Sequence, residues 1–480
     1  MLFNSYEFVV FFPLVMLFFF NLPYGARPLF LLLASYIFYM WWRPEYIILL
    51  LFQTFIDYIA GIYIADSKSP SRRKLFLALS MTSNLSVLFF YKYFMFFNST
   101  GKALFELLHL QYPVPYMEIL LPVGISFYTF QSMSYTIDVY RGETKVERSF
   151  LIFSLFVTFF PQLVAGPIER SSNLLSQIYE RQAFDTRRLV HGLRHILWGL
   201  FKKMVIADRL AVIVHSAYSD PHQHKGLPLL VATYCFAFQI YCDFSGYSDI
   251  ATGTAQVMGY RLMCNFWKPY HAQSIGDFWR RWHISLSTWF RDYVYIPLGG
   301  NRVSRFRQHV NLFVTFLASG FWHGANWTFI VWGALHGLYM VCSLATQKWR
   351  DKLRARTGLE RWPRFLALFR VFVTFHLVCL GWIFFRAQSL KDAWYITTHL
   401  FSSLDPSRLL NLGLTGCELG IAAGCIVILE TVHLLEQKHP LKELLDSVPM
   451  WVRWPMYVGM SLAVLNLGTV TEIPFIYFQF

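Results

Sequence analysis

Long apolar runs alternate with short polar connections from one end of this chain to the other. A bilayer-crossing helix needs about 20 apolar residues, and several of these runs are shorter. We therefore expect an all-α membrane protein with about 11 transmembrane helices plus re-entrant and interfacial helices. Strand-like alternation and hairpin signals are too few for a transmembrane β-barrel. The apolar segments cover residues 6–20, 28–42, 46–65, 75–97, 117–139, 150–165, 196–218, 227–244, 310–319, 328–344, 365–385, 414–435 and 450–467.

The basic residues lie mostly in the connections and predict the orientation of the chain. Cytoplasmic loops of membrane proteins are enriched in Lys and Arg. Residues 68–74, 261–307 and 347–364 are strongly basic, so we expect all three stretches in the cytoplasm and the N-terminus outside. The same bias explains the net charge of +14 without a nucleic-acid partner.

One apolar segment does not fit a simple count of crossings. If residues 150–165 crossed the membrane fully, the arginines between 170 and 188 would lie outside, against the charge rule. The segment is short and contains Pro161, so we expect a broken, re-entrant element. Asp185 is a predicted N-cap for the helix that follows, which has an apolar stripe and a basic face. Such a helix suits the cytoplasmic interface, and a merely solvated basic face explains it equally well.

Composition supports a membrane protein built as one unit. Hydrophobic residues make up 55% of the 480 residues and charged residues only 15%, against about 25% charged in soluble proteins. The first apolar run lacks the flanks of a cleaved signal peptide, so we expect it to remain as a helix. The seven cysteines are scattered without a C-x-x-C pair, so we expect neither a metal site nor a disulfide framework. No linker or inverted repeat appears, which predicts a single integral domain over residues 1–480.

The most unusual position in the apolar pattern is His323, in the octapeptide 320–327 between two apolar runs. Ionisable groups at membrane depth are costly and usually face a bundle interior or a wet cavity, where they serve function. Gly320 and Gly324 flank the histidine and allow a bend, or close approach of another backbone or a substrate. By itself, this octapeptide is equally consistent with a structural histidine bonded to a carbonyl.

Further polar blocks interrupt apolar sequence at residues 122–131, 159–170, 241–249 and 276–293. Taken singly they are explained by polar contacts between helices, as we expect for Ser126, Thr129 and Gln131. Together with the histidine motif they resemble the membrane-bound O-acyltransferase superfamily over almost the full length. The closest likeness is to its bacterial branch that contains the membrane subunits of alginate O-acetyltransferases. The resemblance rests on Phe3-Asn4-Ser5, Arg280-Arg281-Trp282-His283, Trp322-His323-Gly324 and Gly381-Trp382-Ile383-Phe384-Phe385-Arg386-Ala387.

The resemblance implies a ring of helices around a central tunnel, in a multi-pass protein of the bacterial inner membrane, surrounded by lipid. It implies that His323 is essential and that His283 belongs to the same core. It further implies a cytoplasmic acyl donor and an acceptor on the outer face. We therefore expect acetyl transfer from acetyl-CoA, with no resident cofactor, for O-acetylation of an exported polysaccharide such as alginate. A periplasmic or extracellular acetyltransferase partner is expected to complete the transfer.

The chemistry of acyl transfer supports these residues independently. A base must take the hydroxyl proton, and hydrogen-bond donors must stabilise the oxyanion. We assign the base to His323, with Trp322 beside it in the substrate site. The oxyanion donor is His283, Asn326 or backbone N–H groups at the Gly324 bend, and an acyl-histidine intermediate remains open. No Gly-x-Ser-x-Gly elbow supports a serine nucleophile.

The arginines near His283 have two possible roles, one in substrate binding and one in structure. Arg280 and Arg281 could steer the phosphates of coenzyme A, which is anionic. Alternatively, Asp243 and Asp249 pair with Arg280, Arg281 or Arg291 in a structural ion-pair network. We expect His336 to be structural, because on one continuous helix it would face away from His323.

Three other functions compete with this prediction. Within the same class, the acceptor could be peptidoglycan or teichoic acid. In the teichoic acid case a carrier protein, not coenzyme A, would present D-alanine. A transporter or flippase would also place polar groups in the membrane, but transporters often have repeated halves, which this sequence lacks. A structural scaffold leaves His323 and His283 unexplained.

Overall fold

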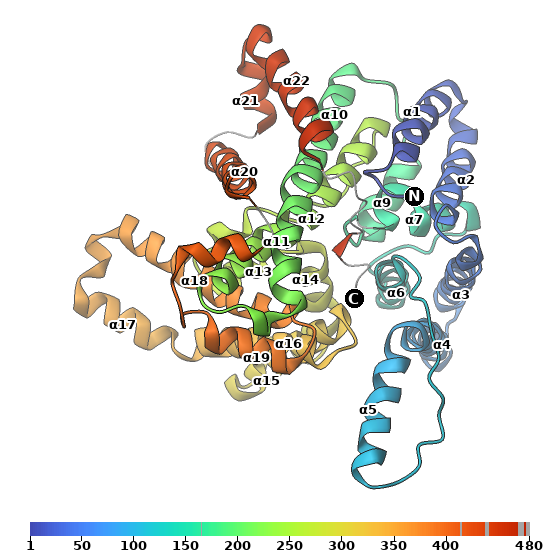
Figure 1. Ribbon diagram of the computed structural model, residues 1–480. Coiled ribbons are helices and arrows are strands. Elements are labelled where there is room, and N and C mark those ends of the chain that lie inside the picture. The colour runs from blue at the N-terminus through green and yellow to red at the C-terminus, as the bar shows by residue number, and fades with distance from the viewer. Residues whose placement is uncertain (165, 413–414, 437–440, 469–474, 477–480) are drawn as a thin grey trace. The chain divides into compact units, whose positions relative to one another are not determined.

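The computed structural model describes residues 1–164, 166–412, 415–436, 441–468 and 475–476, and within them it contains helices and no strand (Figure 1). The chain packs into two compact units. Unit 1 is Met1–Ile196 with Ser248–Met263, and unit 2 is Leu197–Tyr247 with Cys264–Phe480. The all-α prediction is confirmed.

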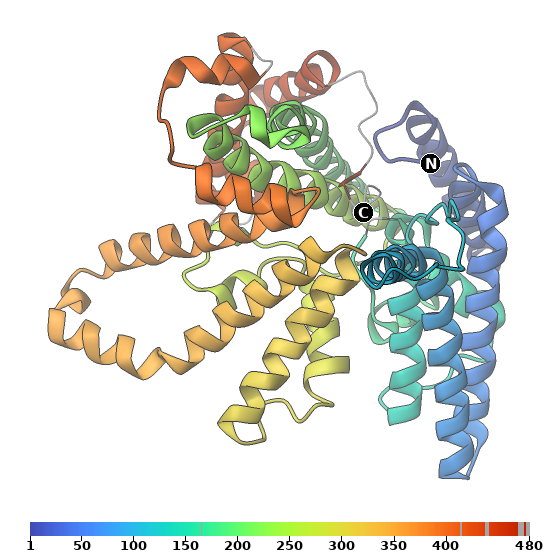
Figure 2. The same ribbon diagram turned by 60° about the horizontal axis from the view of Figure 1, so that its bottom comes forward.

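Unit 1 is a bundle whose polar contacts bind neighbouring helices together. Figures 1 and 2 show α3, α4 and α6 side by side. Buried Asp57 of α3 accepts hydrogen bonds from Ser80 and, at 2.9 Å, from Asn84 of α4. Gln53 donates to Thr129 of α6 at 3.1 Å, which confirms the predicted role of Thr129. The helices of unit 1 are α1 (Tyr6–Asn21), α2 (Arg27–Met40), α3 (Ile47–Asp66), α4 (Pro70–Leu88), α5 (Phe94–Leu107), α6 (Ile125–Arg141), α7 (Phe150–Thr158), α8 (Phe160–Leu163) and α9 (Ser171–Ile178).

The segment expected to be broken and re-entrant is broken in the structure. Helix α7 has 9 residues and α8 only 4, with Phe159 between them in a non-helical conformation. Gln131 and Gln162 each donate to the Phe156 carbonyl at 2.7 Å, so the end of α7 is satisfied by side chains. Residue 165, the end of the predicted segment, lies outside the described residues. Since α7 and α8 are far shorter than a bilayer-crossing helix, the segment does not cross as one helix.

The predicted cap at Asp185 is also present. The Asp185 carboxylate accepts the backbone N–H of Arg188 at 2.8 Å, and α10 (Thr186–Leu200) begins at the next residue. The carboxylate also complements the positive end of the helix dipole.

Unit 2 contains the remaining helices and the motif residues described below. Helices α15 and α16 form an antiparallel pair, and α17 follows them in the chain (Figure 2). Helix α12 contributes residues to both units. The helices are α11 (Asp208–Ser219), α12 (Leu227–Met258), α13 (Ile275–Trp279), α14 (Ile284–Phe290), α15 (Arg305–His323), α16 (Trp327–Ala345), α17 (Gln347–Thr357), α18 (Pro363–Arg386), α19 (Leu390–His399), α20 (Gly416–Leu435), α21 (Leu441–Ser447) and α22 (Met450–Leu467).

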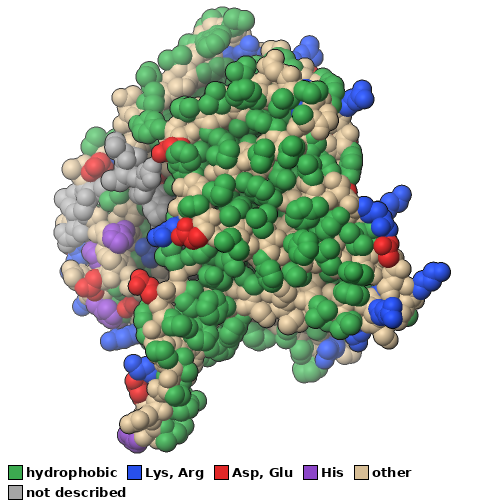
Figure 3. Space-filling view, turned by 90° about the vertical axis from the view of Figure 1, so that its right-hand side faces the viewer, with side chains coloured by type: hydrophobic (Ala, Val, Ile, Leu, Met, Phe, Trp, Pro, Cys, Tyr) green, Lys and Arg blue, Asp and Glu red, His purple; other side chains and the backbone are tan. Residues whose placement is uncertain are grey.

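The outer surfaces have the character expected of a lipid contact. Figure 3 shows a face dominated by hydrophobic side chains, with most lysine and arginine near its margins. Exposed apolar residues on α2 and α3 include Leu33, Ile37, Ile48, Phe52 and Phe55. An apolar surface of this extent marks a membrane contact rather than a water-facing surface.

Six helical stretches among the described residues are long and apolar enough to cross a membrane. Other expected spans form shorter helices: α1 has 16 residues and α2 has 14. The protein is therefore all-α and polytopic, with short apolar helices packed among the longer ones. The six are Pro44–Asp66, Pro70–Leu107, Leu227–Met258, Trp327–Ala345, Pro363–Arg386 and Gly416–Leu435.

Candidate active site

His323 is the last residue of α15, directly before a break in the helical backbone. The chain leaves helical geometry at Gly324 and resumes it at Trp327. The two helices meet through Gly320 and Gly333. A Cβ at Gly320 would lie 2.4 Å from the Phe329 carbonyl oxygen. The glycine expected to permit close backbone approach therefore does so, and this contact sets the position of the final turn that carries His323.

Aromatic rings enclose the His323 imidazole. The side chain is 2% exposed. Its ring centroid lies 5.0 Å from that of Trp322, 4.9 Å from Trp332 and 5.4 Å from Phe385. All three rings meet the imidazole edge-on. This water-poor setting would strengthen any hydrogen bond or charge interaction that forms there during a reaction.

His283 lies beside His323 in the same unit, and the two ring centroids are 6.4 Å apart. His283 is fully buried and precedes α14 with φ 44° and ψ 54°, a left-handed conformation that is uncommon for a residue with a Cβ. Such strain often accompanies function, because the surrounding structure must hold it in place. The Trp322 ring lies 6.1 Å from His283 and therefore borders both imidazoles.

Asn265 determines which nitrogen of His283 carries the proton. Its Oδ1 lies 3.3 Å from the backbone N–H of Ser285, which can only donate, so this atom is the amide oxygen. The same oxygen accepts the Ser285 hydroxyl at 2.9 Å and lies 3.2 Å from His283 Nδ1. Nδ1 is therefore the protonated nitrogen and Nε2 carries the lone pair.

Burial also keeps the His283 ring neutral. Loss of hydration lowers the pKa of His283 to about 3. With Nδ1–H donating to Asn265, the neutral ring offers an acceptor at Nε2 and has no second N–H for an oxyanion. The geometry thus favours a hydrogen-bond-accepting role for His283 over the role of oxyanion donor.

The two arginines expected to bind substrate differ in their surroundings. Arg280 is 75% exposed and lies 3.8 Å from the Asp277 carboxylate, whereas Arg281 is 28% exposed and lies 3.0 Å from it. The expected pairing of Asp243 with these arginines is wrong. Asp243 lies instead 2.7 Å from the ammonium of Lys203, because both project into the buried core of unit 2.

Asn326 is placed as a helix cap. Its side-chain oxygen accepts the Thr328 N–H at 3.1 Å at the start of α16. Its amide nitrogen donates to the Gln388 carbonyl at 3.2 Å. Both ends of the carboxamide are thus engaged, and the backbone N–H groups near Gly324 become the stronger oxyanion candidates.

His336 is fully buried on α16, and the Trp279 indole N–H donates to its Nδ1 at 3.3 Å. The expectation that His336 faces away from His323 required one continuous helix through both residues, and it is wrong because the helix breaks at Gly324. Both imidazoles lie against Trp332, at 4.9 Å and 5.0 Å between ring centroids. The hydrogen bond from Trp279 gives His336 a buried partner of its own, which suits the structural role expected of it.

Two residues of this cluster did not stand out in the sequence. Asn265 belongs to no motif, and it becomes important only because the fold brings it to His283. Trp332 lies within an apolar run, where an aromatic residue is common. Phe385, in contrast, belongs to the motif 381–387, which the sequence analysis had singled out.

The family model described as MBOAT, membrane-bound O-acyltransferase family, matches residues 143–387, which include both histidines and Asn265. The chain belongs to the membrane-bound O-acyltransferase family. It is therefore an O-acyltransferase and a multi-pass membrane protein.

Three relatives indicate the range of acceptors within this family. The chain is 41% identical to a protein named probable alginate O-acetylase AlgI from Pseudomonas aeruginosa, over 82% of this chain and 74% of the relative. A protein of the same name from Pseudomonas putida is 36% identical over the full length of both. The peptidoglycan O-acetyltransferase of Helicobacter pylori is 36% identical over 82% of this chain and 78% of the relative.

Proposed function

We propose that this membrane-bound O-acyltransferase works in the bacterial inner membrane and passes acetyl from cytoplasmic acetyl-CoA to an exported polysaccharide such as alginate. The observation that carries the proposal is the buried pair His283 and His323, with ring centroids 6.4 Å apart in an aromatic enclosure. The names of the relatives from Pseudomonas support the choice of acetyl group and acceptor.

His323 is the general base in this proposal. It removes the proton from a hydroxyl as the oxygen attacks the acetyl carbonyl, and backbone N–H groups near Gly324 stabilise the oxyanion. When the intermediate collapses, the carbon–sulfur bond breaks, the thiolate of coenzyme A leaves and it takes up the proton from the imidazolium. The hydroxyl acceptor is the polymer itself or a group on a partner that carries acetyl onward.

His283 has a second, supporting role. Asn265 holds its Nδ1–H, so Nε2 faces away from that contact as an acceptor. A base oriented by a third group through its other nitrogen is the general arrangement of acyl-transfer sites. We assign His283 to orienting the attacking hydroxyl, which would donate a hydrogen bond to Nε2.

Arg280 is the residue best placed to attract an anionic donor. Its 75% exposed side chain is weakly held by Asp277, whereas Arg281 is held more closely. Reversing the charge of Arg280 should raise the apparent KM for acetyl-CoA and reduce its dependence on salt. A periplasmic or extracellular acetyltransferase would then act on the outer side, with membrane lipid surrounding the helices.

The test measures acetyl ester on polymer from cells that produce each variant at matched levels. His323→Ala and His323→Gln should each lower the rate about 10²–10⁴-fold, because neither side chain can accept a proton at neutral pH. His309→Ala changes another histidine of α15 and should keep the wild-type rate. An active His323→Gln enzyme would contradict the assignment and make His283 the base.

Peptidoglycan is the second candidate acceptor, supported by the relative from Helicobacter pylori. The two acceptors are separated by measuring acetyl ester on exported polysaccharide and on isolated cell wall in the same cells. Acetyl found only in the cell wall, and lost in His323→Ala, would reject the polysaccharide and keep the catalytic assignment.

A further inference from the structure

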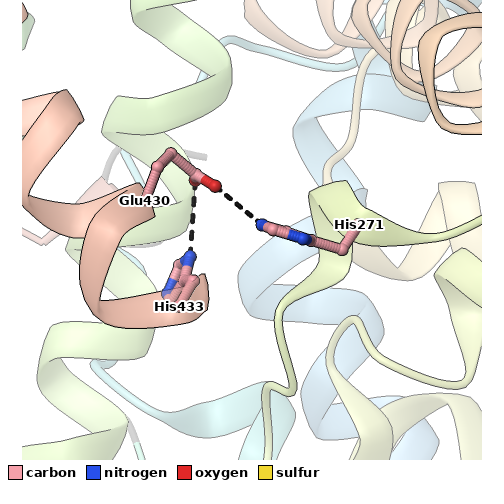
Figure 4. A group of neighbouring side chains, drawn as sticks. All are labelled: His271, Glu430 and His433. Carbon is pink, nitrogen blue, oxygen red and sulfur yellow. Dashed lines mark hydrogen bonds and ion pairs between the residues drawn. The ribbon is translucent and has the colours of Figure 1, made fainter. Parts of the chain in front are cut away.

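A second group of histidines lies in unit 2, apart from the His283–His323 pair (Figure 4). His271 ends the 3₁₀ turn η6 (Pro269–His271), and Glu430 and His433 lie near the end of α20. His271 Nε2 is 2.7 Å from one oxygen of Glu430, and His433 Nδ1 is 3.3 Å from the other. Glu430 therefore lies between two imidazoles that come from separate elements.

The spacing on α20 is suited to a shared ligand. Residues three apart lie on the same face of a helix, so the Glu-x-x-His sequence directs the carboxylate and the imidazole toward one point. His271 approaches from η6, although it is 159 positions from Glu430 in the chain. One ligand atom from each side chain lies within 4.8 Å of the other two.

Neighbouring contacts hold these side chains in place. The Tyr241 hydroxyl lies 3.1 Å from His433 Nε2, so the other nitrogen, Nδ1, is turned toward Glu430. Outer contacts of this kind orient metal-binding histidines in other proteins. Lys268 and Glu436 lie 3.5 Å apart and make a second link between the turn before η6 and the end of α20.

The group can be reached from outside the unit. The side chains of His271 and Glu430 are 22% and 29% exposed. An open groove of about 490 Å³ runs beside Glu430 and is lined otherwise by apolar side chains, including Phe238 and Phe375. A ligand on that side could exchange without unfolding the helices.

We propose that His271, Glu430 and His433 form a binding site for a divalent transition-metal ion of the Zn²⁺ type. Two imidazoles and one carboxylate are a common ligand set for zinc, with Zn–N and Zn–O distances of about 2.0–2.2 Å. Such a set leaves a fourth tetrahedral position for water. The site departs from our expectation of no metal, which rested on the cysteines alone. An ion there would tie α20 to η6.

Cobalt titration of the purified full-length protein in detergent tests the site. After treatment with a chelator, Co²⁺ should produce the visible absorption of a tetrahedral complex at one ion per chain, and Zn²⁺ should displace it. Glu430→Gln should weaken Co²⁺ binding at least tenfold, as should His271→Ala. Glu418→Gln, a carboxylate change on the same helix, should leave binding unchanged.

Replacing one metal-binding side chain by another distinguishes loss of the site from misfolding of the variant. His433→Cys keeps a ligand at the site, so this variant should bind Co²⁺ and gain a thiolate-to-cobalt band in the near ultraviolet that wild type lacks. The proposal is overturned if wild-type protein gives no tetrahedral Co²⁺ spectrum. It is equally overturned if Glu430→Gln binds as tightly as wild type or if His433→Cys gains no new band.

Discussion

The glycine contact between α15 and α16 leads to a prediction about a residue that touches no substrate in the proposed mechanism. Gly320 lies one turn before His323 and packs against α16. A Cβ at this position would lie 2.4 Å from the Phe329 carbonyl oxygen and 2.9 Å from the Gly333 Cα. These atoms belong to backbone, so they cannot turn aside as a flexible side chain would. Gly320→Ala must therefore separate the two helices.

The size of the effect follows from this geometry. Ordinary van der Waals contact begins at 3.4 Å, so the contact at 2.4 Å must open by about 1 Å. Overpacking of this kind costs about 1–3 kcal/mol of stability. Displacement of a catalytic group by about 1 Å can lower the rate about 10²-fold. Since His323 is on the next turn of the same helix, we expect activity to fall about 10²-fold even where folded protein remains.

The assay combines acetyl ester on polymer with the apparent melting temperature of the protein in detergent. Gly424→Ala is the matched control, because a Cβ at Gly424 of α20 would meet nothing within 4 Å. This variant should keep wild-type activity and melt no lower than wild type, because alanine favours a helix interior more than glycine does. Gly320→Ala should lose both, and activity should fall further than the amount of folded protein.

A Gly320→Ala protein with wild-type rate and melting temperature would refute this reasoning. That result would mean that α15 and α16 can separate without moving His323. A lower melting temperature with an unchanged rate per folded protein would also refute it, since the contact would then serve stability alone.

Three further predictions concern charge. Burial raises the pKa of Glu169 to about 7 from 4.5, so the stability linked to its proton is lost as the pH rises from 4.5 through 7, on the order of 3 kcal/mol in all. Glu169→Gln removes this titration, so the variant should melt above wild type at pH 8 by more than at pH 5. Lys203 is 1% exposed, and its ammonium lies 2.7 Å from the carboxylates of both Asp208 and Asp243. Lys203→Met should therefore lower the stability of the folded protein by about 3–5 kcal/mol, seen as a lower melting temperature, and an unchanged melting temperature would contradict the buried ion pair. A single cysteine within Gln347–Thr357, in a background without native cysteines, should resist an impermeant thiol reagent added to whole cells, and labelling would reverse the orientation.

Much of the local structure could be predicted because its causes are local. Apolar runs without strand periodicity predict helices, and the described residues form helices. The proline-containing segment 150–165 predicts a broken element, and the chain breaks at Phe159. Asp185 caps α10 because a short carboxylate reaches an N–H three residues ahead. Gly320 indicated a close approach, although the partner on the other side could not be identified.

The number of crossing helices was harder to predict, because hydropathy alone does not decide whether a short apolar helix crosses the membrane. Residues 6–20 and 28–42 are apolar over 15 residues each, and they form helices of 16 and 14 residues. Apolar side chains serve a packed bundle as well as a lipid contact. The distinction depends on neighbouring helices, which periodicity does not describe.

The motifs alone identified His323 and His283 as candidate site residues, and the family match shows the acyltransferase class. Only the tertiary structure decided their surroundings: Asn265 sets the tautomer of His283, and Trp332 contacts both His323 and His336. It also decided that Asp243 pairs with Lys203, and that His271 meets a Glu-x-x-His pair 159 positions away. Local sequence fixes which face of a helix a side chain occupies, because helical geometry repeats every few residues. The partner across from that face depends on how distant helices pack, and no local pattern encodes it.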